Sequence, residues 1–303
     1  MKPPIRIVTD STSDLPQEVA AEHGIAVVPA YINIEGKSYV DGIDLTREEF
    51  YARLPQYRTP PTTSAPSLGT FIETYERLAA QGAAQGAAQG TAQGAAPRAA
   101  QGAQEILSIH VSAALSGILN VAHAAAQATE AARVTVFDSK QLTLGTGFLA
   151  LAAARAAAIG RSMAEVVDML KEMVQRVYSF AALDTLEYLR RGGRLTRIQS
   201  SIGAVLRVKP LLTMYDGEMT MEKVRTRRRA IERMIELVHE LGPLEQLALV
   251  HAHALDRVEI LRQKARHLIP AGPDPFCEEV TSVIGAHVGP GSVGLVCVKA
   301  HQE

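Results

Sequence analysis

Ile5-Arg6-Ile7-Val8-Thr9-Asp10-Ser11-Thr12-Ser13-Asp14 is the stretch of sequence that decides the fold class of this chain. It begins as a short apolar run rich in β-branched residues and continues as a polar loop ahead of a helical stretch. This order of strand, loop and helix is typical of a parallel α/β sheet, whose strands are buried on both faces. The same order recurs at residues 106–117 and 134–140. Three such units predict a mainly parallel sheet in the first half of the chain.

The second half of the chain has a different pattern. Two alternating segments at residues 211–215 and 218–221 flank Asp216-Gly217, a pair strongly favoured in hairpin turns. Further along, we expect a strand at 247–250 and a final pair of strands around 289–291. Amphipathic helices are expected at about 227–241 and 256–268. These elements predict a second sheet that is mixed and contains antiparallel strands.

The length of the chain predicts two domains. With 303 residues it exceeds the size at which a single hydrophobic core usually stops growing. An Ala-rich helix is expected at about 143–158, and the repeated order of strand, loop and helix in the first half ends with it. We therefore expect an N-terminal α/β domain over residues 1–159 and a C-terminal α/β domain over residues 160–303.

Residues 81–103 form a low-complexity segment in the expected N-terminal domain. Gln-Gly-Ala-Ala recurs there at a four-residue step, and the segment contains no large apolar side chain. Alanine favours a helix, but each glycine costs about 0.5–1 kcal/mol relative to alanine. Such a segment buries little surface to offset its ordering entropy. We predict a mobile surface loop, and a neutral expansion is favoured over a functional one.

Charge and composition exclude several classes of protein. The formal net charge is −1, from 31 basic and 32 acidic residues, so no footprint for nucleic acid or an anionic membrane is expected. No stretch of 18 uncharged apolar residues suggests a membrane span, and Met1 to Pro4 run directly into the first strand. Cys277 and Cys297 lack the spacing of a metal site. A cytoplasmic protein without stable membrane insertion, metal or cofactor is expected.

Hydroxyl side chains gather at two predicted helix starts in the first half. Backbone N–H groups lack partners at a helix start, and the helix dipole favours an anion there. Two such starts in one domain could jointly hold a carboxylate, and the alternative is that the hydroxyls only cap their helices. The hydroxyl residues are Thr62, Thr63, Ser64, Ser67, Ser112 and Ser116.

Eight segments in collinear order resemble the DegV family over nearly the whole chain. They are Thr9–Pro16, Tyr39–Gly42, Thr63–Ser67, Ser108–Ser112, Leu115–Gly117, Phe137–Gln141, Gly192–Leu195 and Ile284–Gly291. The chain departs from the family pattern at Ala65, where Gln is common, and at Ile118, where Thr often follows Ser-Gly. The segment at 81–103 is not a family feature.

The resemblance implies two α/β domains with a ligand cleft between them, which holds a long-chain fatty acid such as palmitate in a tunnel. Thr63 and Ser116 match the hydroxyls that hold the carboxylate, and His287 matches a histidine placed near it. Arg194 matches an arginine on the side that faces a fatty-acid kinase, the partner to which some members present the acyl carboxylate. Ser64 and Ser112 are further candidates for ligand binding. The bound fatty acid would be the ligand, in a role in lipid transport or fatty-acid metabolism.

An enzyme of another class remains the alternative. Asp10 follows an apolar strand as the nucleophile of an aspartyl-phosphate phosphatase does, but Thr12 stands where a second carboxylate is expected. Ser116 and His287 could belong to a hydrolase, although the segment around Ser116 lacks the G-x-S-x-G pattern. A lipid-binding protein that is not an enzyme is the favoured hypothesis, because the hydroxyls have no activating base at a recognisable spacing.

Overall fold

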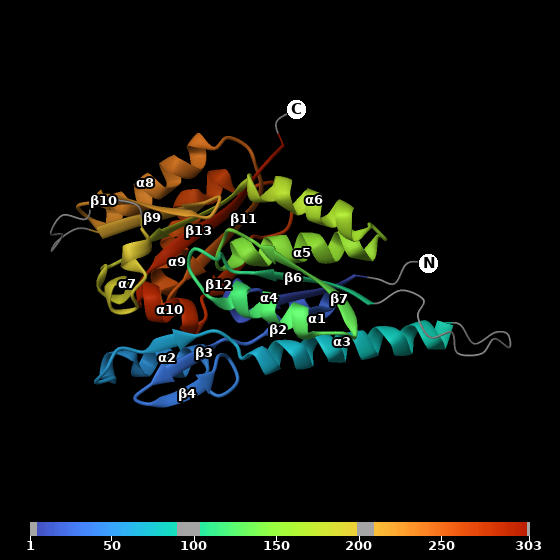
Figure 1. Cartoon of the computed structure of the whole chain (residues 1–303). Helices are drawn as coiled ribbons and strands as arrows, with labels where there is room; N and C mark the ends of the chain where they lie inside the picture. The colour runs from blue at the N-terminus through green and yellow to red at the C-terminus, as the bar shows by residue number, and fades with distance from the viewer. Residues whose placement is uncertain (1–4, 90–103, 199–208, 302–303) are drawn as a thin grey trace.

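The computed structural model describes residues 5–89, 104–198 and 209–301. Its first sheet is parallel, with the strand order β2-β1-β6-β7 (Figure 1). The four strands are β1 (Arg6–Asp10), β2 (Ile25–Val28), β6 (Gln104–His110) and β7 (Ala132–Asp138). The expected parallel sheet in the first half is therefore confirmed. Because the strands are parallel, the loops that follow β1, β6 and β7 leave the same edge of the sheet.

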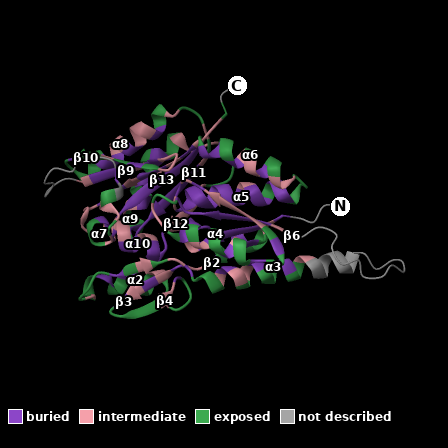
Figure 2. Cartoon of the chain, in the orientation of Figure 1, coloured by how far each residue is buried: buried purple, intermediate pink, exposed green. Residues whose placement is uncertain are grey.

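Helices cover both faces of this sheet. On one face, α3 (Leu68–Gln89) packs against α4 (Ile118–Ala128), and on the other face α5 (Leu144–Ala158) packs against β1 and α6 (Met163–Val174) (Figure 1). The short helix α1 (Gln17–Glu22) connects β1 with β2. Nearly all of α5 is buried, as its purple colour in Figure 2 shows. A helix that is apolar all round belongs in an interior, and α5 also contacts strands of the second sheet.

The prediction of a loop over residues 81–103 is wrong for its first part. Helix α3 continues to Gln89, so residues 81–89 are helical, while 90–103 lie outside the described residues. Phe71, Tyr75 and Leu78 are buried and anchor the first turns of α3. Extending an established helix adds a hydrogen bond for each residue without a new nucleation cost, so the alanines outweigh the glycines here.

A small antiparallel sheet lies beside the parallel one, in the order β4-β3-β5. Its strands are β3 (Tyr31–Ile34), β4 (Lys37–Val40) and β5 (Thr62–Ser64). Helix α2 (Arg47–Arg53) connects β4 with β5, and a capping box between Thr46 and Glu49 fixes its start. This layer places Thr63, on the edge strand β5, opposite Ile32 on the central strand β3.

The second half forms a six-stranded mixed sheet in the order β10-β9-β8-β13-β11-β12. Neighbouring strands are antiparallel except β11 and β12, which confirms the expected mixed sheet. The Asp216-Gly217 hairpin is also confirmed, with both residues at positive φ. The strands are β8 (Val177–Ala182), β9 (Lys209–Tyr215), β10 (Glu218–Val224), β11 (Leu244–His251), β12 (Cys277–Glu279) and β13 (Val293–Lys299).

Four helices accompany the mixed sheet. Helices α8 (Arg227–Glu240) and α9 (Leu255–Ala265) cover its outer face, and α7 (Glu187–Arg191) packs on α10 (Ser282–Val288). The prediction of a pair of strands around 289–291 is wrong for its first strand. Helix α10 precedes this turn, and strand β13 follows it. Thr281 extends the chain before α10 and Gly289 ends the helix at φ 75°, a backbone conformation that suits glycine.

The sheets of the two halves are segregated along the chain, but one hydrophobic core cluster spans both halves. Every strand before residue 139 belongs to the first two sheets, and every strand after 176 belongs to the mixed sheet. One core cluster joins residues of both halves, such as Ile7 and Leu107 with Val250 and Val296. The boundary between 159 and 160 falls between α5 and α6 and stays a prediction. No helix in the described parts of the chain is long and apolar enough to span a membrane.

A buried carboxylate connects the two halves. Asp14 accepts hydrogen bonds from Thr143 Oγ1 at 2.6 Å and from the backbone N–H of Thr281 at 2.7 Å. The guanidinium of Arg47 lies 3.9 Å away, and Asp41 is a second buried acid nearby. Burial raises the pKa of Asp14 to about 6, against the opposing charge of Arg47. Deprotonation of Asp14 therefore places a charge in the interior at a desolvation cost that the two hydrogen bonds and Arg47 offset only in part.

We predict that Asp14→Asn removes a pH-dependent loss of stability. The folded pKa of Asp14, about 6, lies above its ordinary value of 3.8, so its stabilisation is complete below the lower value and is lost as the pH rises through the higher one. An asparagine does not titrate: its Oδ1 can accept from the Thr281 N–H, and its Nδ2 can donate to the Thr143 hydroxyl, which reverses that hydrogen bond. Between about pH 4 and about pH 8, the difference in unfolding free energy should shift in favour of the variant by about 2–3 kcal/mol.

Urea unfolding of both proteins across this pH range measures the shift. Asp256→Asn, at an exposed position in the first turn of α9, is the matched control and should not change the pH dependence. Parallel stability curves for wild type and Asp14→Asn would contradict the assignment.

Candidate functional site

An apolar cavity lies between the parallel sheet and the mixed sheet. Its empty space, including its opening to solvent, is about 1030 Å³. Both halves of the chain contribute to its walls, among them Val111, Leu115, Leu142, Leu212, Met214 and Met219. A cavity with such walls favours a ligand that is mostly hydrocarbon.

Four of the residues expected from the sequence line this cavity: Thr63, Ser116, Arg194 and His287. They come from four different elements. Thr63 lies on β5, Ser116 lies in the turn before α4, His287 lies in the last turn of α10, and Arg194 follows α7. The structure thus brings together residues that are up to 224 positions apart in the sequence.

Ser64 and Ser112 are elsewhere. Ser64 is exposed, and its Oγ accepts a hydrogen bond from Asn33 Nδ2 at 3.3 Å. Ser112 is buried, and its Oγ accepts from the backbone N–H of Ala114 at 3.3 Å. Neither residue lines the cavity. Ser64 does not line the cavity because adjacent residues of a strand face opposite sides of the sheet, and its neighbour Thr63 faces the cavity.

His287 connects the two halves at the polar part of the cavity. Its Nε2 lies 2.9 Å from Thr63 Oγ1. Burial lowers the pKa of the imidazole to about 4, and the positive charge of Arg194 lowers it further in the same direction. The ring is therefore neutral at pH 7 and carries one proton.

The surroundings of His287 decide which nitrogen holds that proton. Nδ1 is buried and has no hydrogen-bond partner among the described residues. A buried N–H without an acceptor costs about 1–3 kcal/mol, whereas Nε2 has an acceptor in the Thr63 oxygen. The proton consequently belongs on Nε2, which donates to Thr63 Oγ1. The hydroxyl hydrogen of Thr63 then points away from the ring.

Sequence reasoning missed four further hydroxyls that line the cavity. Each of them already donates its hydrogen within the protein. The pairs are Thr12 to Asp10, Thr143 to Asp14, Ser179 to Gln141 and Ser292 to the carbonyl of Val288. Thr12 belongs to the segment Thr9–Pro16, but no local sequence signal shows that its hydroxyl, or those of Thr143, Ser179 and Ser292, would reach this cavity, because the four residues are far apart along the chain.

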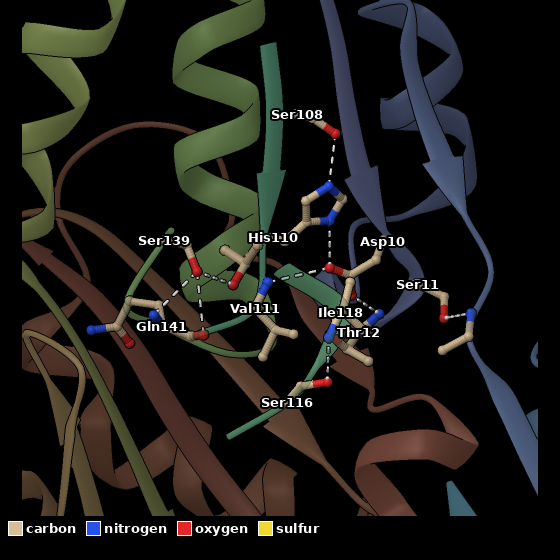
Figure 3. Close-up of polar contacts among 12 residues, drawn as sticks. Asp10, Ser11, Thr12, Ser108, His110, Val111, Ser116, Ile118, Ser139 and Gln141 are labelled. Carbon is tan, nitrogen blue, oxygen red and sulfur yellow. Dashed lines mark hydrogen bonds and ion pairs between the residues drawn. The ribbon is translucent and has the colours of Figure 1, made fainter. Parts of the chain in front are cut away.

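Ser116 differs from these four hydroxyls. Its Oγ accepts a hydrogen bond from the backbone N–H of Ile118 at 3.3 Å (Figure 3). Within the described part of the chain, no acceptor takes its hydroxyl hydrogen. Thr63 and Ser116 are therefore the two lining hydroxyls, among the described residues, that remain free to donate to a ligand.

Asp10 belongs to a buried network and not to the cavity. One carboxylate oxygen accepts from the N–H and the hydroxyl of Thr12, and the other accepts from His110 Nδ1 at 2.9 Å and from the N–H of Val111 at 3.2 Å (Figure 3). His110 Nε2 continues the chain to Ser108 at 2.7 Å. The Asp10 side chain is fully buried and does not line the cavity. These contacts argue against its use as a phosphatase nucleophile.

The geometry also argues against a hydrolase built on Ser116 and His287. A hydrolase needs a histidine that receives the serine proton and a carboxylate that orients that histidine. His287 Nε2 is paired with Thr63, and its Nδ1 has no carboxylate or other partner in the described residues. The relay of serine, histidine and acid is not assembled there.

A parallel sheet and a mixed sheet that enclose one apolar cavity, with donors at its polar part, define an α/β protein with an internal ligand cavity. A family model described as "Uncharacterised protein, DegV family" matches residues 4–85 and 89–300. The chain belongs to the DegV family.

Individual relatives match along nearly their whole length. A DegV domain-containing protein of Caldanaerobacter subterraneus subsp. tengcongensis is 35% identical over 297 residues, which cover 96% of this chain and 97% of that protein. A DegV domain-containing protein of Streptomyces coelicolor is 36% identical over 295 residues, which cover 96% and 97%.

Two solved structures are similar to this one. The structure titled "Fatty Acid Binding of a DegV family Protein from Thermus thermophilus" has a TM-score of 0.80 at 30% identity and covers 98% of this chain and 100% of that chain. DegV from Bacillus subtilis, described as a fatty acid binding protein, has a TM-score of 0.82 at 30% identity, with coverage of 98% and 99%. These matches confirm the α/β fold with a parallel and a mixed sheet.

We predict that Asp10→Ala lowers stability and does not abolish a catalytic activity. The substitution leaves His110 without its buried carboxylate and removes acceptors for two backbone N–H groups. Breaking such a buried pair costs about 3–5 kcal/mol, to be measured by urea unfolding. Asp256→Ala, at an exposed site, should cost less than about 1 kcal/mol. A variant that stays as stable as wild type but loses hydrolysis of a phosphate ester would support the phosphatase alternative.

Proposed function

We propose that the protein binds one long-chain fatty acid, such as palmitate, in its cavity, with the carboxylate held by Thr63 and Ser116. The observation that carries this proposal is the division among the lining hydroxyls. Four of them donate within the protein, and the two that do not are Thr63 and Ser116. A carboxylate is an acceptor only, so it is the complement of two uncommitted O–H donors. The Thermus thermophilus and Bacillus subtilis relatives, described as fatty-acid binding, support a fatty acid as the ligand.

The acyl chain supplies most of the affinity. Transfer of one methylene from water to an apolar environment is favourable by about 0.8 kcal/mol. A chain of about 14 methylenes therefore contributes on the order of 10 kcal/mol before the costs of association. The cavity walls of valine, leucine and methionine suit this role, and methionines such as Met214 and Met219 adapt to an irregular chain.

The carboxylate head group loses its hydrogen bonds to water on binding, and donors of the protein must replace them. Thr63 and Ser116 each offer one hydrogen, and the His287 Nε2–H behind Thr63 polarises that hydroxyl. Arg194 lines the same cavity, and its Nη1 donates to the carbonyl of Gly192 at 2.7 Å. A carboxylate held by hydroxyls keeps its charge and stays available for reaction.

This availability fits a carrier that presents the acyl group to a fatty-acid kinase, with Arg194 at the contact with the partner. The proposed role is lipid transport or fatty-acid metabolism, without a cofactor and without catalysis by this chain alone. Hydrolysis is not favoured, because the described residues assemble no activated nucleophile.

Organic extraction followed by mass spectrometry of purified protein tests the proposal. We expect the release of a C16–C18 fatty acid in a molar amount close to that of the protein. As a control, the same extraction of heat-denatured and washed protein should release little. Protein that is consistently free of lipid, fails to bind added palmitate and hydrolyses esters or phosphates would contradict the proposal.

We predict that Thr63→Val and Ser116→Ala each weaken palmitate binding while unfolding stays cooperative. Each change removes a hydrogen bond to a charged acceptor, worth roughly 1.5–3 kcal/mol. The double variant should exceed either single variant, although neighbouring sites need not be additive. Palmitate titration by calorimetry measures the affinities.

Ser64→Ala is the matched control, since Ser64 neighbours Thr63 but does not line the cavity. Arg194→Ala should weaken binding less than either hydroxyl change and should impair acyl-phosphate formation with a kinase. If Arg194→Ala abolished binding while Thr63→Val and Ser116→Ala had no effect, the carboxylate would be ion-paired with the arginine.

A further inference from the structure

Gly192 lies directly against the ring of His287. A Cβ atom built on Gly192 would stand 2.2 Å from His287 Nδ1 and 2.7 Å from its Cε1. Real Cβ atoms do not approach other atoms this closely, so any side chain here must displace the ring. The backbone of Gly192 has φ −76° and ψ −2°, a conformation that every residue adopts. Space beside His287, and not backbone freedom, therefore requires the glycine.

The turn that carries Gly192 is held on both sides. The N–H of Gly192 donates to the carbonyl of Tyr188 at 2.9 Å, and the N–H of Arg194 donates to the carbonyl of Leu189 at 3.0 Å. The Gly192 carbonyl accepts from Arg194 Nη1 at 2.7 Å. These bonds tie the turn to α7, so the imidazole is the part that would yield to a larger residue.

We infer that Gly192 is a positioning residue that holds the His287 ring with Nδ1 against the glycine Cα and Nε2 on Thr63. The bare Cα offers Nδ1 no acceptor, which keeps the proton on Nε2. With that proton on Nε2, the Thr63 oxygen accepts from the ring and the Thr63 hydrogen is directed to the ligand carboxylate. The role of Gly192 toward the ligand rests on the proposed function, whereas its hold on the ring does not.

A methyl group at position 192 should undo this arrangement. The imidazole ring has to move away from the new methyl group and loses its hydrogen bond with Thr63. The Thr63 hydroxyl can then turn its hydrogen toward other acceptors. The moved ring also gains access to water. Its pKa should then rise from about 4 toward the ordinary value of 6.5, since burial is the main cause of the low value and the charge of Arg194 is the second.

The first experiment uses wild-type protein without added ligand and observes the imidazole nitrogens of His287 by ¹⁵N NMR. We expect a protonated Nε2 and an unprotonated Nδ1 at neutral pH. A proton on Nδ1 would overturn the inference. This measurement needs no substitution and no fatty acid, so it remains decisive if a variant fails to fold or if the proposed ligand is wrong.

The second experiment compares Gly192→Ala with wild type in the same NMR titration and in palmitate binding. The variant should raise the pKa of His287 and weaken palmitate binding roughly five- to tenfold, less than Thr63→Val, because the Thr63 hydroxyl is still present and only its orientation is lost. In a His287→Ala background, the same change should alter affinity less than about twofold, because the residue through which it acts is gone. Gly69→Ala in α3 is the control, since the nearest atom to its new Cβ would be 3.7 Å away.

The outcomes separate the two hypotheses. An unchanged His287 titration in Gly192→Ala, or an equal loss of affinity with and without His287, would overturn the role of Gly192. Failure of wild type to bind palmitate would contradict the proposed function, while the NMR titration would still decide whether Gly192 holds the ring.

Discussion

The packing of helix α5 between the parallel and the mixed sheet is the constraint on which the rest of the structure depends. Its glycines allow this close approach, because a Cβ on Gly145 would lie 3.0 Å from the Gln141 and Ser179 side chains and one on Gly147 would lie 2.9 Å from the Ser13 carbonyl. The loops at the carboxyl edge of the parallel sheet therefore face the second sheet directly. Ligands of open α/β sheets bind at this edge, and the second sheet converts the edge into an enclosed cavity.

Which hydroxyls of the cavity can donate to a ligand depends on the hydrogen bonds that they already make within the protein, and not on residue type alone. Among the residues that the structure describes, six hydroxyls line the cavity, and four of them donate to acceptors that also hold the fold together, including Asp14 at the junction of the halves. The neutral His287 assigns an acceptor role to the Thr63 oxygen and leaves its hydrogen available. The four committed hydroxyls thus contribute to the fold, and under the proposed function the other two, Thr63 and Ser116, receive the anionic head group.

Local patterns predicted most elements of the fold. Strand β1 and its polar loop, the Asp216-Gly217 hairpin and helix α8 lie where periodicity and turn residues indicated. The errors concern segments in which local preferences are balanced. Residues 81–89 are helical because α3 extends from an anchored start, and residues 282–288 form a helix although their apolar run suits a strand equally well.

The sequence by itself determined the class of sheet in each half, which follows from local periodicity. Thr63, Ser116, Arg194 and His287 became candidates through the resemblance of the collinear motifs to the DegV family. Only the tertiary structure decided which hydroxyls can serve a ligand. Ser64 and Ser112 have the same chemistry as Ser116 but point elsewhere, and Thr143 and Ser179 line the cavity with their hydrogens committed. The physical reason is that the availability of a donor depends on acceptors that folding brings from distant positions, 129 residues away for Thr143 and 38 for Ser179.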